Sequence, residues 1–123
     1  MFSLSRNGIL TFNKGDSFSI PLFINKGTDI CPIQYEVTGK DQVVLAITQP
    51  QQDFYHSSIT KIFTESDKNE HGDVMISLSG KDTCYLPGGL YYYQIKLRKY
   101  NLEKNEYDVI TITNKNQLYL IEE

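Results

Sequence analysis

The chain has 123 residues, of which 40% are hydrophobic and 22% are charged, and its formal net charge is −3. This length suits one domain, residues 1–123, with a core large enough to fold without a metal or a disulfide. The acidic balance and the scattered basic residues exclude the strong basic footprint of a nucleic-acid-binding protein.

The start of the chain carries no export signal, because Met1–Gly8 has a polar and Gly break where a signal peptide would be apolar. No apolar run approaches the roughly 18 residues that a membrane span needs. We therefore expect no membrane partner and a protein that is made in a cytoplasm.

Turn residues recur at short intervals along the chain, and the stretches between them are rich in β-formers, which predicts an all-β fold. The clearest strand is Ser17–Ile24, where Phe18, Ile20 and Leu22 share one face by the period of two. Pro21 cannot donate a ladder hydrogen bond, so this strand is expected at a sheet edge.

The middle of the chain predicts four more strands. Ile33–Val37 alternates, and Gln42–Thr48 is apolar on both faces, which suits a central strand covered on both sides or one with a partner over its outer face. Ser58–Phe63 is weaker because Lys61 shares a face with apolar residues, whereas Asp73–Leu78 alternates well.

The last third predicts one helical turn within Lys81–Leu86 and a long strand over Leu90–Tyr100. Val109–Thr113 and Gln117–Ile121 are expected to form a hairpin across residues 114–116, and Gln117–Ile121 should be a second sheet edge. We predict seven to nine strands in two sheets. The expected core is Phe18, Ile20, Leu22, Tyr35, Val37, Val74, Ile76, Tyr93, Ile95, Leu97, Ile110 and Leu120.

No group of residues predicts catalysis. Asp53, His56 and Ser57 have the residue types of a hydrolase triad, but residues this close on an extended chain cannot form the relay. No phosphate-binding loop and no marked carboxylate pair is present. We expect no enzymatic activity, no catalytic residue and no cofactor.

The cysteines and histidines do not have metal-ligand spacing, so no metal site is expected. Cys31 lies in a loop and Cys84 in a turn, and neither is in mid-strand, where a bridge between sheets would be placed. We predict two reduced, partly buried thiols, with a single disulfide as the alternative.

Apolar side chains on outer faces predict a protein-binding surface, because Tyr, Phe and Met are enriched at interface cores. One alternative is that Tyr92 is an ordinary surface aromatic and that loops cover the rest; another is a sugar-stacking platform. We expect partners among identical copies or neighbouring proteins, and no small molecule. The predicted interface residues are Phe23, Met75, Tyr92 and Tyr119, with one side of Val43–Ile47.

Several motifs together resemble the immunoglobulin-like N-terminal domain of phage baseplate upper proteins and similar small phage structural domains. The first is the turn Lys14-Gly15-Asp16-Ser17 before an alternating strand. Ile33–Val37 follows a short polar loop, and Asp82-Thr83 precedes the step from Leu86-Pro87-Gly88-Gly89 into a Tyr-rich strand. The resemblance covers about Ile9 to Ile121, and Asp108–Ile112 with Leu118–Ile121 close it as a hairpin.

The resemblance implies an immunoglobulin-like antiparallel β-sandwich that docks to other virion proteins as a baseplate, tail, neck or decoration subunit. It implies no catalytic residue. In the family this domain is usually the front part of a longer chain, so a sequence that ends at Glu123 favours a free-standing adaptor, neck or decoration role. The alternative function is a carbohydrate-binding or cell-surface β-sandwich module without catalysis.

Overall fold

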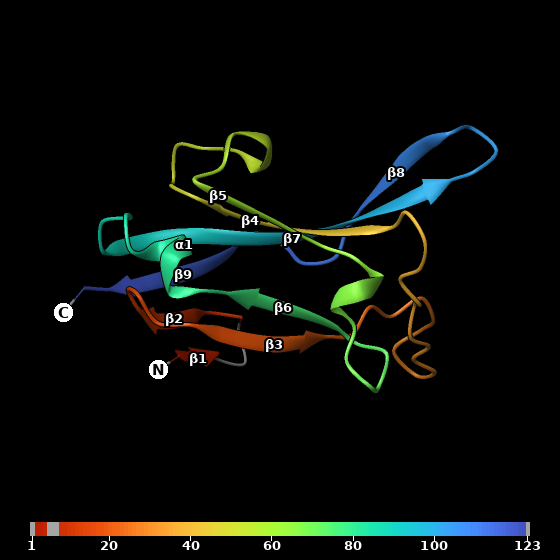
Figure 1. Ribbon diagram of the computed structural model, residues 1–123, viewed down its shortest axis with the longest axis horizontal. Helices are drawn as coiled ribbons and strands as arrows, with labels where there is room; N and C mark the ends of the chain where they lie inside the picture. The colour runs from red at the N-terminus through yellow and green to blue at the C-terminus, as the bar shows by residue number, and fades with distance from the viewer. Residues whose placement is uncertain (1, 5–7, 123) are drawn as a thin grey trace.

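Two β-sheets face one another in the computed structural model, which describes residues 2–4 and 8–122 (Figure 1). The larger sheet has the order β1-β2-β9-β7-β4-β5, with β8 also beside β7, and β3 pairs with β6 in the smaller sheet. The all-β prediction is confirmed. The strands are β1 (Phe2–Leu4), β2 (Leu10–Asn13), β3 (Phe18–Leu22), β4 (Gln42–Thr48), β5 (Ile59–Phe63), β6 (Val74–Leu78), β7 (Gly89–Asn101), β8 (Glu106–Thr111) and β9 (Asn116–Ile121).

Alternation along the strands builds the core between the sheets. On β6, Val74, Ile76 and Leu78 are each 2% exposed. Phe12 of β2 packs edge-to-face on Phe18 of β3, with ring centroids 5.1 Å apart, and joins the two sheets at one side. Of the predicted core, these are buried: Phe18, Val37, Val74, Ile76, Tyr93, Ile95, Leu97 and Leu120. Ile20, Leu22 and Tyr35 are partly buried against them.

Ile110 is the error in the predicted core, since it is 47% exposed. Its side chain does lie on the same face of the sheet as Leu97, its cross-strand partner. However, β8 extends past β3 and β6, so the smaller sheet does not cover that face of the strand (Figure 1). The alternation of side chains correctly predicted the face of the sheet on which Ile110 lies. It did not predict that the opposite sheet ends before it reaches this residue.

The predicted hairpin across residues 114–116 is wrong, because β8 and β9 do not pair with each other. Both pair with the same edge of the 13-residue β7, β9 along its first half and β8 along its second. The N–H groups of Ile112 and Thr113 both donate to the Ile95 carbonyl, at 2.9 and 3.2 Å, so the chain bulges between the two strands. The true hairpin joins β7 to β8 through a turn that ends at Asn105, where φ is 55°.

The predicted sheet edges are half right. Among the described strands, β3, which contains Pro21, pairs with β6 alone, as expected of an edge strand. β9 is not an edge, because β2 runs parallel to it on the side away from β7. One pair in the larger sheet is therefore parallel, a departure from the purely antiparallel arrangement that we expected.

The predicted strand Ile33–Val37 is not formed. The segment has one isolated bridge, from Gln34 to Asn25, in place of a ladder. The Asn25 side chain satisfies the local backbone instead: its Oδ1 accepts from the N–H groups of Gly27 and Ile33 at 2.8 and 3.0 Å. An Asn at this position favours a compact loop over a strand pair.

The central strand β4 is covered on both sides, as its apolar sequence predicted. Val44 and Ala46 point to the outer face of the larger sheet, yet they are only 5% and 1% exposed. A loop after β4 contains the 3₁₀ turn η1 (Phe54–His56) and folds back against this strand. The expectation that one side of Val43–Ile47 would be open to a partner is therefore wrong.

The predicted helical turn is present as α1 (Gly80–Thr83), although it begins before the predicted range Lys81–Leu86 and ends short of Leu86. The Asp82 side chain caps the N-terminal end of this turn, because its Oδ2 accepts from the backbone N–H and the hydroxyl of Ser79 at 2.8 and 3.1 Å. The inward-facing Lys61 of β5 pairs with Asp82 Oδ1 at 3.3 Å, which ties an edge strand to the turn. A second 3₁₀ turn, η2 (Glu65–Asp67), follows β5, and within the described residues no helix is long and apolar enough to cross a membrane.

We expect Asp82→Asn to destabilise the fold by about 1 kcal/mol at pH 7, an effect that fades in acid. Burial opposes ionisation of Asp82, but the Ser79 N–H and Lys61 outweigh it and lower the pKa. A lowered folded pKa gives stability that is full above the unfolded value of about 3.9 and is lost as the pH falls through the folded value. Urea unfolding at pH 7 and near pH 3 measures this. Asp29→Asn, in an exposed loop, is the control, and an Asp82→Asn effect that does not change with pH would contradict the assignment.

Candidate binding surfaces

The four predicted interface residues lie on different faces of the molecule. Tyr92 and Tyr119 are on the outer face of the larger sheet, and Met75 is on the outer face of the smaller one. Phe23 follows β3 and is 50% exposed, because the next residue, Ile24, turns into the core. The structure does not bring Tyr92 together with Phe23 and Met75, so these residues do not form one patch.

A groove of about 620 Å³ runs between the inner face of the β7–β8 hairpin and the chain that follows β3. Its lining is mainly apolar, and both Phe23 and Ile110 are about half exposed there. Of the predicted interface residues, only Phe23 lines this groove. The lining residues are Phe23, Ile24, Asn25, Lys26, Tyr35, Leu97, Lys99, Ile110, Thr111 and Ile112.

One end of the groove is fixed by a buried carboxylate. Asp41 is 6% exposed and accepts hydrogen bonds from the Tyr35 hydroxyl at 2.7 Å and from the Tyr100 N–H at 2.9 Å. Burial, together with this bond to Asp41, raises the pKa of the Tyr35 hydroxyl far above its usual range. Because Asp41 directly precedes β4, Tyr35 closes the groove on the β4 side.

The other side of the groove opens toward the free edge of β8. Among the strands that the structure describes, β8 pairs only with β7. The Ile112 N–H, just after β8, donates to the Ile95 carbonyl of β7. Since the backbone groups of successive residues alternate in direction, this bond fixes which residues of β8 hydrogen-bond to β7. By that alternation, the backbone groups of Tyr107, Val109 and Thr111 point away from β7 and are available to another strand.

Two lysines stand at the groove without a counter-charge. No ion pair joins Lys26 or Lys99 to any carboxylate among the described residues. Lys99 Nζ lies 5.6 Å from the centre of the Tyr35 ring, and Asp108 is its cross-strand neighbour without reaching ion-pair distance. The groove therefore combines an apolar floor with positive charge, although the whole chain is acidic.

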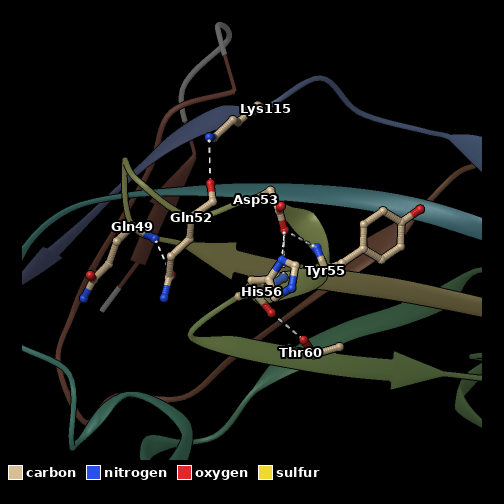
Figure 2. A network of polar contacts seen from close by, with 8 residues as sticks. Gln49, Gln52, Asp53, Tyr55, His56, Thr60 and Lys115 are labelled. Carbon is tan, nitrogen blue, oxygen red and sulfur yellow. Dashed lines mark hydrogen bonds and ion pairs between the residues drawn. The ribbon is translucent and has the colours of Figure 1, made fainter.

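A smaller pocket of about 200 Å³, whose lining residues are all polar except Phe54, lies on the opposite face of the larger sheet. Thr48 of β4 and Gln94 of β7 form its floor, and the loop around η1 forms a wall. Figure 2 shows Lys115, from the bulge between β8 and β9, reaching over to the Gln52 carbonyl at 3.5 Å. The lining residues are Thr48, Gln52, Asp53, Phe54, Gln94 and Lys115.

Asp53 organises the loop beside this pocket (Figure 2). Its Oδ1 accepts from the N–H groups of Tyr55 and His56 at 3.0 and 2.9 Å and faces His56 Nδ1 at 2.8 Å. The bond to His56 is the main reason that the pKa of Asp53 is lowered. The hydroxyl of Ser57 bonds to Thr60, and that of Ser58 bonds to Gln52.

Asp53 and His56 thus pair, but neither serine hydroxyl bonds to the imidazole. The pair is exposed, with 65% of the Asp53 side chain and 82% of the His56 side chain open to solvent. A nucleophile, its base and an orienting acid need to be in hydrogen-bond contact, and this loop does not bring the three together. Among the described residues, no group of three or more potential ligands could hold a metal ion.

Both cysteines are free, as predicted. Cys31 and Cys84 are also exposed, which corrects the expectation that they would be partly buried. Cys31 is at the surface because the loop around it folds on Asn25 and Thr28 and leaves its own side chain outside.

Apart from Phe23, the residues that line the two cavities are not predicted as site residues by the sequence, because most of them come together only through long-range pairing. The hairpin predicted across residues 114–116 places Lys115 in a turn, whereas it lines the smaller pocket. Comparison with known proteins adds nothing to these geometries: no family model, no curated protein and no solved structure matches this chain.

Proposed function

We propose that this chain is a non-catalytic docking subunit of a phage virion, of the baseplate, tail, neck or decoration class, that binds a neighbouring protein through the groove beside β8. The groove is the observation that carries the docking role. It is the larger of the two cavities described above, it exposes apolar side chains, and it adjoins a free strand edge. The virion setting rests on the resemblance of the sequence motifs.

The strand order supports an immunoglobulin-like sandwich as the finer description of the fold. The run β9-β7-β4-β5 opposite β3-β6 corresponds to strands G, F, C and C′ opposite B and E of a variable-type domain. At the start of β7, the Tyr91 hydroxyl donates to the Pro87 carbonyl at 2.6 Å. A tyrosine bonding back to the preceding corner is a hallmark of these domains.

The occupant that the groove fits best is an extended, acidic and apolar segment of a partner protein. An added strand could bond to the free backbone of Val109 and its neighbours, which is a common mode of peptide recognition. Its inward side chains would meet Ile110 and Phe23, and a carboxylate on it would meet Lys99 and Lys26.

The test is incorporation into particles. We expect density-gradient-purified phage particles to contain the chain at a fixed copy number per virion, measured by quantitative mass spectrometry. Phe23→Ser with Ile110→Ser should reduce that number about tenfold or more while the melting temperature stays nearly unchanged, because both side chains are half exposed.

Tyr92→Ser with Tyr119→Ser is the matched control, since it removes two aromatics from the other face. Normal incorporation of the groove variant would exclude the groove as the docking site. If the wild-type chain is absent from purified particles, the virion assignment is wrong.

A further inference from the structure

We infer that the polar pocket on the outer face of the larger sheet binds a single sugar ring, either free or at the end of a glycan. This inference is independent of the docking groove and departs from our expectation that the chain binds no small molecule. It starts from the buried hydroxyl at the floor of the pocket.

Thr48 is only 4% exposed, yet its hydroxyl makes no hydrogen bond to any described residue. Every fully enclosed side-chain nitrogen or oxygen in the described part of the chain has a partner. The Thr48 hydroxyl must therefore open into the pocket that it lines. A hydroxyl held in place by a central strand and left unpaired is ready to bond to a ligand.

Three further polar groups around the pocket have free bonding capacity. The Gln94 amide, which lies on the neighbouring strand, has no side-chain partner among the described residues. Asp53 uses Oδ1 for its bonds to the η1 turn, which leaves Oδ2 without one. The Lys115 ammonium has only its long bond to the Gln52 carbonyl and a position 4.9 Å from the centre of the Tyr92 ring.

One carboxylate, Asp53, and one ammonium, Lys115, line the pocket, and this balance suits a neutral ligand that carries hydroxyl groups. An anion would be repelled by Asp53 and a cation by Lys115. A hydroxyl group both donates and accepts, so adjacent hydroxyls on one ring can bond to the carboxylate, the ammonium, the amide and Thr48 together. Phe54 adds an apolar surface to the pocket, with the Lys96 ammonium 4.5 Å from the centre of its ring.

The size of the pocket limits the ligand to one ring. About 200 Å³ corresponds to the space of about seven water molecules. That is room for one ring with its hydroxyls, and further units of a glycan would extend into solvent. For about a dozen ligand atoms we expect a dissociation constant of about 1–10 mM.

The experiment is a titration of the ¹⁵N-labelled full chain with glucose, galactose, mannose, rhamnose and N-acetylglucosamine, followed by amide chemical shifts. At least one sugar should give saturable shifts at Thr48, Gln52–Phe54, Gln94 and Lys115. The double variant Thr48→Val with Gln94→Met keeps the size of both side chains and should weaken that binding about tenfold. Lys115→Met, at an exposed position, should weaken it as well and leave the melting temperature nearly unchanged.

Lys99→Met is the control on the opposite face, and it should leave sugar binding unchanged. The inference is overturned if no sugar in the panel gives saturable shifts at these residues up to about 100 mM, ten times the expected range. It is equally overturned if the double variant, with its spectrum otherwise intact, binds as tightly as the wild type. Neither result would affect the docking proposal, because particle incorporation is tested with groove variants.

Discussion

Ile76→Ala should lower the free energy of unfolding by about 2–5 kcal/mol, because it leaves a cavity at the centre of the interface between the sheets. Ile76 is 2% exposed and lies on β6. The smaller sheet has only two strands, and its inward side chains hold it against the larger sheet. A loss of packing at this position therefore weakens both sheets together.

Urea unfolding followed by far-UV circular dichroism measures the change, and Ile62→Ala is the matched control. Ile62 is the same residue type on an edge strand, but it is 51% exposed. Its truncation should cost less than about 1 kcal/mol, since little buried area is lost. Equal losses for the two variants would mean that the smaller sheet does not cover this face of the core.

Side-chain patterns in the sequence predicted the strands that carry a long alternating run or a continuous apolar run. It placed Gln42–Thr48 at the bounds that β4 has, and it placed β6 and β7 within one residue at each end. These strands carry long alternating or continuous apolar runs, and the burial of each face follows directly from the side-chain pattern.

Pairing between distant strands could not be predicted in the same way. Residues 114–116 have the composition of a hairpin turn, but the length of β7 lets β8 and β9 share its edge, so the chain bulges and continues. Likewise, the sequence of β9 does not reveal that β2 runs beside it. Turn-forming residues predict the local backbone conformation, but they do not predict which strands pair on either side of the turn.

The candidate sites depend on that pairing, which explains why they were found only in part. Phe23 was predicted from its place on the outer face, and it does line the groove. Its neighbours there, Lys99 and Ile110, come from β7 and β8. Lys61 looked like a defect in its strand, but it is a tether to Asp82, a partner that becomes visible only when α1 is placed beside β5.

The buried carboxylate behind the groove gives the second large effect. Asp41→Ala should cost about 2–4 kcal/mol of unfolding free energy, because it leaves the Tyr35 hydroxyl and the Tyr100 N–H without their acceptor. It should also loosen Tyr35 and so weaken docking in the groove. Asp108→Ala, an exposed carboxylate on β8, should change stability by less than about 0.5 kcal/mol and serves as the control.

A double-mutant cycle separates the bond from the rest of the site. Tyr35→Phe alone should cost about 1 kcal/mol, and it should cost much less in the Asp41→Ala background, because the acceptor of its hydroxyl is already gone. Urea unfolding of the four proteins gives the coupling free energy, for which we expect about 1 kcal/mol. A coupling near zero would show that Tyr35 is held by packing alone. In that case the Asp41→Ala loss would come from Tyr100, and the groove wall would not depend on the carboxylate.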